Sequence, residues 1–83
     1  MKVRVRYFAS IREALGPTET VELPDGSTLA VLRDALISRS HAHAQALSRG
    51  RALRAALNQV MADESMVVAD GVEVAFFPPV TGG

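Results

Sequence analysis

The chain has 83 residues, of which 48% are hydrophobic and 22% are charged, proportions typical of one small globular domain rather than a disordered segment. Nine basic residues balance nine acidic ones, so no excess charge would attract nucleic acid or an anionic membrane. Cysteine is absent, which excludes a disulfide framework, a thiolate metal site and a cysteine nucleophile.

The N-terminal residues carry no secretory signal. Residues 1–6 alternate charged and apolar side chains, whereas a signal peptide needs an unbroken apolar run, and no later stretch is long enough to span a bilayer. We therefore expect a cytoplasmic protein with no membrane partner. Lys2 is the only lysine, and its place near the start of a predicted strand argues against Schiff-base chemistry.

Residues 2–8 have the alternation of a half-buried strand. Val3, Val5 and Tyr7 fall on one face, and the opposite face is charged except for Phe8. This segment is the first predicted strand.

A short helix is predicted to follow. Ser10 and Glu13 have the spacing of a capping box, in which the hydroxyl serves the Glu13 backbone N–H and the carboxylate reaches back to Ser10. Gly16-Pro17 is expected to end the helix. Residues 18–23 then alternate again as a second strand, which the turn residues 24–26 end.

The main helix is expected to begin at a cap formed by Ser27 or Thr28. Its apolar stripe recurs at i, i+3 and i+7 and is broadened by two further side chains. These residues are Leu29, Leu32 and Leu36, with Val31 and Ala35 beside them.

Residues 41–61 are harder to interpret, because alanine, leucine and arginine favour helix while the fold needs strands. We expect a short helix over residues 41–47, with Gly50 ending it in a left-handed conformation. A strand is expected over 53–57, a turn at Asn58-Gln59 and a short strand at 60–61.

The last predicted strand covers residues 72–77, after a turn at Asp70-Gly71. Pro78-Pro79 cannot donate ladder hydrogen bonds and stiffens the chain, so residues 80–83 are predicted to project from the body as a tail.

This order of elements predicts an α+β fold of the ubiquitin-like β-grasp type, a mixed sheet packed on one main helix with a flexible C-terminal tail. The body would cover residues 1–79 and the extended Gly-Gly tail 80–83. In such a fold the first and last strands are parallel neighbours, which places Phe8 beside Phe77 on the outward face. An exposed aromatic patch is therefore expected next to the tail.

Gly82 and Gly83 fit a tail that enters another protein's active site, since residues without a Cβ pass through narrow channels. A terminal carboxylate becomes an acyl donor once ATP converts it to an acyl-adenylate. Taken alone, two terminal glycines are more often a loose chain end. The stiff Pro78-Pro79 segment directly after an apolar strand favours a presented tail.

Across its whole length the chain resembles the small subunit family of molybdopterin synthase, least clearly over residues 41–54. The resemblance rests on residues 76–83, Phe-Phe-Pro-Pro-Val-Thr-Gly-Gly, with several shorter matches. These are Tyr7-Phe8-Ala9, Arg12-Glu13, Asn58-Gln59, Asp70-Gly71 and Glu73-Val74-Ala75. Val72 departs from the pattern, where the family usually has an acidic residue.

The resemblance implies a sulfur carrier rather than an enzyme acting on its own. An ATP-dependent activating enzyme would adenylate Gly83, which would then carry sulfur as a thiocarboxylate, with Gly82 beside it. The large synthase subunit would receive the tail and pass the sulfur to cyclic pyranopterin monophosphate, in a heterotetramer of two small and two large subunits. The expected contact residues are Phe8, Phe77, Pro78, Pro79, Val80 and Thr81.

No metal or permanently bound cofactor is implied, ATP being used by the activating enzyme. His41 and His43 point in different directions on a helix and are interpreted as surface residues. Arg49, Arg51 and Arg54 are interpreted as a solvated edge without an assigned role. Alternatives from the same fold are a thiamine-pathway sulfur carrier, a protein modifier attached through Gly83 and an unreactive adaptor.

Overall fold

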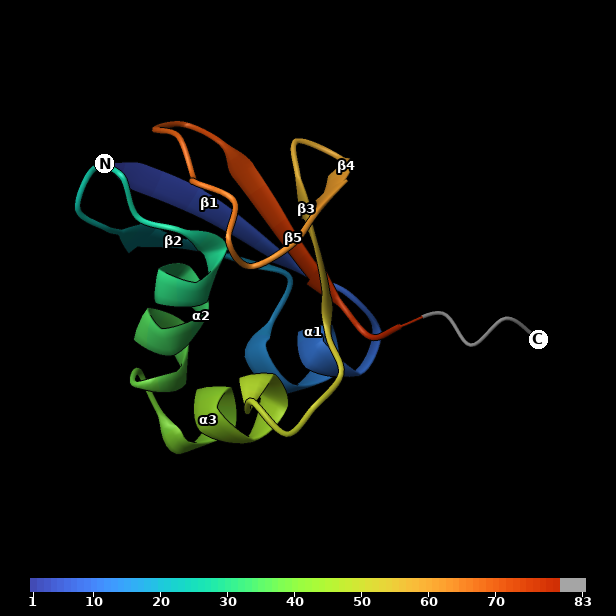
Figure 1. The fold of residues 1–83 in the computed structure, drawn as a ribbon. Coiled ribbons are helices and arrows are strands. Elements are labelled where there is room, and N and C mark those ends of the chain that lie inside the picture. Colours follow the sequence, from blue (N-terminus) through green and yellow to red (C-terminus); the bar gives the residue numbers. More distant parts are fainter. Residues whose placement is uncertain (80–83) are drawn as a thin grey trace.

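The computed structural model describes residues 1–79, in which three helices lie on one face of a single sheet (Figure 1). The elements follow in the order β1 Lys2–Tyr7, α1 Ala9–Leu15, β2 Thr18–Glu22, α2 Leu29–Ile37, α3 His41–Leu47, β3 Arg54–Leu57, β4 Val60–Ala62 and β5 Glu73–Phe77. This is the predicted α+β, β-grasp arrangement.

The sheet has the strand order β2-β1-β5-β3-β4. β1 and β5 lie parallel at its centre, with Arg4 opposite Glu73 and Arg6 opposite Ala75, while every other neighbouring pair is antiparallel. The predicted pairing of the first and last strands is therefore confirmed. It brings the end of β5, from which the tail continues, beside the end of β1.

The core lies between the sheet and the helices. Alternation along β1 and β5 sends every second side chain to the helical face, and the stripe of α2 meets them there. The buried cluster comprises Val3, Val5, Tyr7, Ile11, Val21, Leu23, Leu29, Leu32, Leu36, Ala46, Leu47, Ala55, Val68, Val72, Val74 and Phe76. Fully burying one such aliphatic or aromatic side chain contributes about 1.5–3 kcal/mol.

The hairpin between β3 and β4 turns through Asn58 and Gln59, as predicted. Both residues have positive φ, 46° and 70°, as two-residue turns of this kind require. Asn58 also ties the turn to β5, because its side-chain oxygen accepts a 3.0 Å hydrogen bond from the Glu73 backbone N–H. The turn is thus fixed against the central strand.

The predicted capping box at Ser10 and Glu13 is wrong. Helix α1 begins at Ala9, with Phe8 at its N-cap and no side-chain cap. Phe8 is held on the sheet by its backbone N–H, which donates to the carbonyl of Phe76 at 3.2 Å. Ala9, with φ of 54°, then turns the chain directly into the helix, so Ser10 lies inside the first turn instead of before it.

Helix α2 uses Thr28 as its cap, its hydroxyl oxygen accepting from the Val31 backbone N–H at 3.3 Å. Its leucine stripe is buried as predicted, and Ala35 packs beside it. Val31, predicted to broaden the stripe, is instead 44% exposed. The unexpected inward residue is Arg33, which is 4% exposed.

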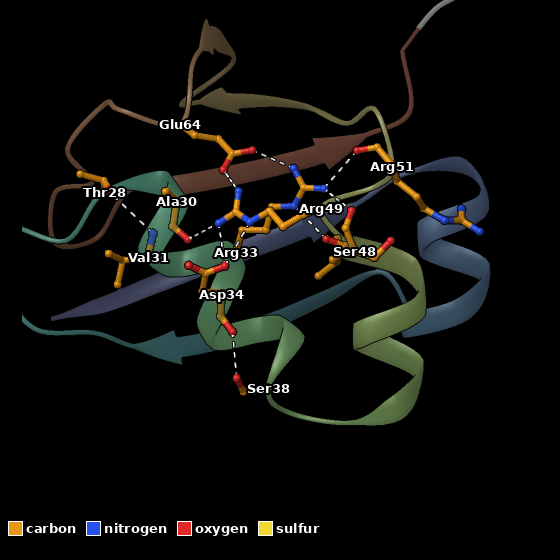
Figure 2. Close-up of polar contacts among 11 residues, drawn as sticks. Thr28, Ala30, Val31, Arg33, Asp34, Ser38, Ser48, Arg49, Arg51 and Glu64 are labelled. Carbon is orange, nitrogen blue, oxygen red and sulfur yellow. Dashed lines mark hydrogen bonds and ion pairs between the residues drawn. The ribbon is translucent and has the colours of Figure 1, made fainter.

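The prediction that Gly50 ends helix α3 is also wrong, and Arg33 provides the ending instead. Helix α3 ends at Leu47 and Gly50 has no positive φ. The Arg33 guanidinium instead donates to the carbonyl of Leu47 at 2.8 Å and to that of Ser48 at 2.5 Å. Figure 2 shows Arg33 beside Ser48. The two carbonyls are ones that a helix end leaves without partners, so a side chain from α2 terminates α3.

The same guanidinium holds two further segments. It donates to the Arg51 carbonyl at 3.1 Å and to Glu64 Oε2 at 2.7 Å. Glu64 also pairs with Arg49, which lies 2.7 Å from Asp34 Oδ1 (Figure 2). Arg49 therefore has a structural role that the sequence did not assign, whereas the side chain of Arg51 is exposed as expected.

Candidate functional site

The outward face of the sheet brings Phe8 and Phe77 together at the point where β5 ends. Their ring centroids are 6.5 Å apart and the ring planes meet at 87°, an edge-to-face contact. Both side chains are half-buried. The sequence-predicted aromatic pair is therefore present, on the face of the sheet opposite the helices.

An open groove of about 410 Å³ extends from this pair across the sheet. The strand register explains its shape, because Ala56 lies opposite Ala75 on one side and Met61 on the other. Two alanines form the floor and larger side chains the walls. The lining residues are Phe8, Ala56, Gln59, Met61, Ala75 and Phe77.

Ala56 marks this groove as a second buried region. It is only 6% exposed although it faces away from the helices and does not belong to the main core. Met61, opposite Ala56 on the neighbouring strand, also faces outward and remains 54% exposed. The outward face thus presents Phe8, Phe77 and Met61 around a floor of small residues, a pattern typical of an interaction surface.

Charged residues border the groove on its β1 side. The Arg6 guanidinium carbon lies 5.2 Å from the centroid of the Phe8 ring, within the range of a cation–π contact. Arg6 also lies 3.5 Å from the Glu73 carboxylate, with both side chains partly exposed. Solvent screens this ion pair, so its effect is to orient the Arg6 side chain over Phe8 more than to stabilise the fold.

Pro78 and Pro79 continue from β5 and are half-buried. Neither has a backbone N–H, so the sheet ladder stops at Phe77. The other predicted site residues, Val80, Thr81, Gly82 and Gly83, lie outside the described residues. The structure therefore places the aromatic pair and the proline segment of the candidate site.

A second polar cluster joins β1, β2 and α3 on the helical side. Tyr7 donates to Glu19 Oε2 at 2.6 Å, His43 Nε2 lies 2.7 Å from the same oxygen, and Arg39 pairs with Oε1. Ser40 Oγ lies 2.7 Å from His43 Nδ1. The interpretation of His43 as a solvated surface residue is wrong, since its side chain is 16% exposed.

These contacts set the protonation of the cluster. Burial, and then the hydrogen bond to Glu19, raise the pKa of the Tyr7 hydroxyl above its usual value. Burial would also raise the pKa of Glu19, but hydrogen bonds from Tyr7, His43 and Arg39 outweigh it and lower that pKa. A neutral tyrosine facing a carboxylate is a stable pair, and the cluster fastens α3 to the sheet.

Within residues 1–79 there is no group of three or more side chains that could hold a metal ion. His41 is exposed, as predicted. Over the same residues, no helix is long and apolar enough to cross a membrane.

Sequence reasoning found the two phenylalanines but missed Ala56, Gln59 and Met61. The signal for them is the pairing of β3 with β5, which places Ala56 opposite Ala75 on the outward face. That pairing joins segments far apart in the chain, and residues 53–57 have no clear alternation from which the outward side could be chosen.

Comparison with known proteins shows which family the chain is related to. A family model described as the ThiS family matches residues 5–83. The molybdopterin synthase sulfur carrier subunit of Escherichia coli is 42% identical over 81 residues, which cover 98% of this chain and 99% of that protein. Similarity at this level over both full lengths means that the whole chain, and not a shared segment, is related.

Solved structures give the same fold. One is a complex of subunits 1 and 2 of molybdopterin-converting factor from Helicobacter pylori, with 27% identity, a TM-score of 0.70 and full coverage of both chains. Another is H. volcanii small archaeal modifier protein 1, with 27% identity and a TM-score of 0.78 over 95% of this chain and 98% of that one. The chain therefore belongs to the ThiS family, and the relatives that match it from end to end include sulfur carrier subunits of molybdopterin synthase.

Proposed function

We propose that this chain is the sulfur-carrier subunit of a molybdopterin synthase, working through the carboxylate of Gly83. The observation that carries the proposal is the end-to-end similarity to the E. coli sulfur carrier subunit, together with a sequence that ends in Gly-Gly. The groove beside Phe77 supports it, because an apolar surface next to the start of the tail would let a partner hold the body while receiving the chain end.

In this proposal the chain supplies an attachment point and a docking surface. A carboxylate oxygen of Gly83 attacks the α-phosphate of ATP in an activating enzyme, releasing pyrophosphate and forming an acyl-adenylate. A sulfur donor then displaces AMP and leaves a thiocarboxylate, whose sulfur is a strong nucleophile. The absence of cysteine from the chain fits a sulfur that is borrowed and not encoded.

The large synthase subunit is the proposed receiving partner, and its active site supplies the acids and bases. There the thiocarboxylate gives its sulfur to cyclic pyranopterin monophosphate, and two deliveries build the dithiolene that later binds molybdenum. The small-subunit relative solved in complex with subunit 2 supports such an assembly. A heterotetramer of two small and two large subunits, in the cytoplasm, is the arrangement we propose.

The residue roles follow from this scheme. Residues 1–79 form the body that docks, with Phe8 and Phe77 as its aromatic anchors, and residues 80–83 form the tail that is chemically changed. Pro78 and Pro79 stiffen the connection between body and tail. Val80, Thr81 and Gly82 contact the walls of the partner's channel. The chain needs no permanently bound cofactor and is not an enzyme by itself.

A truncated variant tests the proposal. Removing Gly83, or adding one residue after it, should abolish sulfur transfer with purified activating enzyme, sulfur donor and large subunit, because the reactive carboxylate then sits at the wrong distance from the partner's catalytic groups. The melting temperature should not change, since the core ends at Phe76. Molybdopterin formed at the normal rate by the truncated chain would reject the carrier role.

The second candidate is a protein modifier joined through Gly83 to lysines of other proteins. The specific observation in its favour is the similarity to H. volcanii small archaeal modifier protein 1. The run Phe76-Phe77-Pro78-Pro79, shared with the synthase small subunits it resembles, favours the carrier over both the modifier and a thiamine-pathway carrier. Covalent adducts of the chain in lysates of its own cells, lost on deletion of Gly83, would favour the modifier instead.

A further inference from the structure

Met61 differs from the other groove residues because its side chain is exposed and carries an oxidisable thioether sulfur. It lies on β4 directly opposite Ala56, lines the groove, and is 54% exposed. A thioether in this position is reached by small solutes from solvent. Nothing in the sulfur-carrier scheme requires a methionine there, since any apolar side chain of similar size would fill the wall of the groove.

The sequence makes methionine the most readily oxidised side chain of this protein. The chain has no cysteine and three methionines. Met1 is partly buried against the core, whereas Met66 is 48% exposed on the loop whose carbonyl accepts from Leu29. Met61 and Met66 are therefore similarly reachable by an oxidant, but only Met61 lines the groove.

We propose that Met61 is an oxidation site whose conversion to the sulfoxide weakens docking of the large subunit; this inference rests on the proposed function. In the step, a peroxide transfers one oxygen atom to the thioether sulfur. The peroxide O–O bond breaks and an S–O bond forms, the sulfur loses two electrons, and hydrogen peroxide is reduced to water. No proton leaves the protein, and reduction by a dithiol-dependent reductase restores the thioether.

The groove gives the physical reason for the effect. A sulfoxide oxygen is a strong hydrogen-bond acceptor that must lose water when a partner covers it. Within the groove, the other lining residues are two alanines, two phenylalanines and Gln59, and Gln59 alone carries a side-chain N–H donor. On its other side Met61 borders a hollow that Arg33 and Arg54 also line. Most of the groove wall cannot donate a hydrogen bond to the sulfoxide oxygen, so oxidation should weaken binding of the partner. The fold should be unaffected, because Met61 is already exposed.

The test measures binding of purified large subunit by calorimetry before and after hydrogen peroxide treatment of the chain in its carboxylate form. Peptide mass analysis confirms the added oxygen at each methionine. The wild type, Met61→Leu and Met66→Leu are each compared with their own untreated form, so any change that a substitution makes to the starting affinity cancels.

Oxidation should raise the Kd of the wild type and of Met66→Leu about tenfold or more, and leave the Kd of Met61→Leu within about twofold of its untreated value. Unchanged affinity of wild-type protein that carries Met61 sulfoxide would overturn the inference, as would an equal loss in Met61→Leu. Failure of untreated wild type to bind the large subunit would overturn the proposed function itself, and the inference with it.

Discussion

Phe77 belongs both to the sheet and to the proposed docking surface. It ends β5, contacts Phe8 edge to face, and forms a wall of the groove immediately before the proline segment. Aromatic side chains at the centre of an interface carry a large share of binding energy because they bury much area with few rotatable bonds. Half-burial in the free chain leaves the remaining ring surface available to a partner.

Replacing Phe77 by alanine should therefore weaken binding of the large subunit by about 2 kcal/mol or more, measured by calorimetric titration. The fold should persist, because Phe77 faces away from the main core cluster. Val31→Ala is the matched control, an exposed apolar side chain on α2 outside the groove. Equal affinities for Phe77→Ala and wild type would remove Phe77 from the interface.

At the scale of elements, one arginine organises the connection between α2, α3 and the strands that follow. Arg33 satisfies carbonyls at the end of α3 and pairs with Glu64, and its side chain is 5% exposed. A buried guanidinium with this many acceptors holds loops that contribute few apolar contacts of their own. The hairpin that supplies Ala56 and Met61 to the groove lies between these segments, after Arg51 and before Glu64.

Arg33→Ala should lower the free energy of unfolding by about 3 kcal/mol, because it leaves the carbonyls of Leu47 and Ser48 and the carboxylate of Glu64 without their buried partner. Arg49→Ala is the control, since its ion pairs with Asp34 and Glu64 are half exposed and should cost less than about 1 kcal/mol. Urea unfolding of both variants makes the comparison. Similar decreases in the free energy of unfolding for the two variants would mean that the buried contacts of Arg33 stabilise the fold no more than the exposed ion pairs of Arg49.

The elements also show where sequence reasoning succeeds. The alternation of β1, β2 and β5, the leucine stripe of α2 and the turn at Asn58-Gln59 were predictable, because each depends on neighbours in the chain. Arg33 was not, since an arginine on a helix is usually solvated and its acceptors lie 14 to 31 residues away. The prediction for His43 failed for the same reason, because its partner Glu19 lies 24 residues away on β2.

For the whole molecule, the parallel pairing of β1 with β5 is the feature that makes a site. It places Phe8 from the beginning of the chain beside Phe77 near its end. β3 then pairs with the other edge of β5, and the hairpin of β3 and β4 completes the groove. The pairing of β1 with β5 could be predicted from the order of elements, and the aromatic pair with it. The outward side of Ala75 could be predicted in the same way, but Ala56 and Met61 could not, because their outward side depends on the long-range register of β3 with β5.

Division of labour is the main consequence of this architecture. Residues 1–79 form a body held by its core and by buried polar contacts, and we propose that this body docks on the partner. In the proposed function the chemistry takes place at Gly83, which the partners would convert to a thiocarboxylate and return to a carboxylate. The proposed function depends on Gly83 carrying sulfur more than on any contact within the fold.

The most direct measurement is the intact mass of the chain after incubation with its activating enzyme, ATP and a sulfide donor, followed by fragmentation to locate the change. If the chain is a sulfur carrier, its mass should increase by the replacement of one oxygen with one sulfur, confined to Gly83, and should not increase when Gly83 is deleted or ATP is withheld. An unchanged mass with an active enzyme preparation, or a mass increase at another residue, would contradict the proposed function.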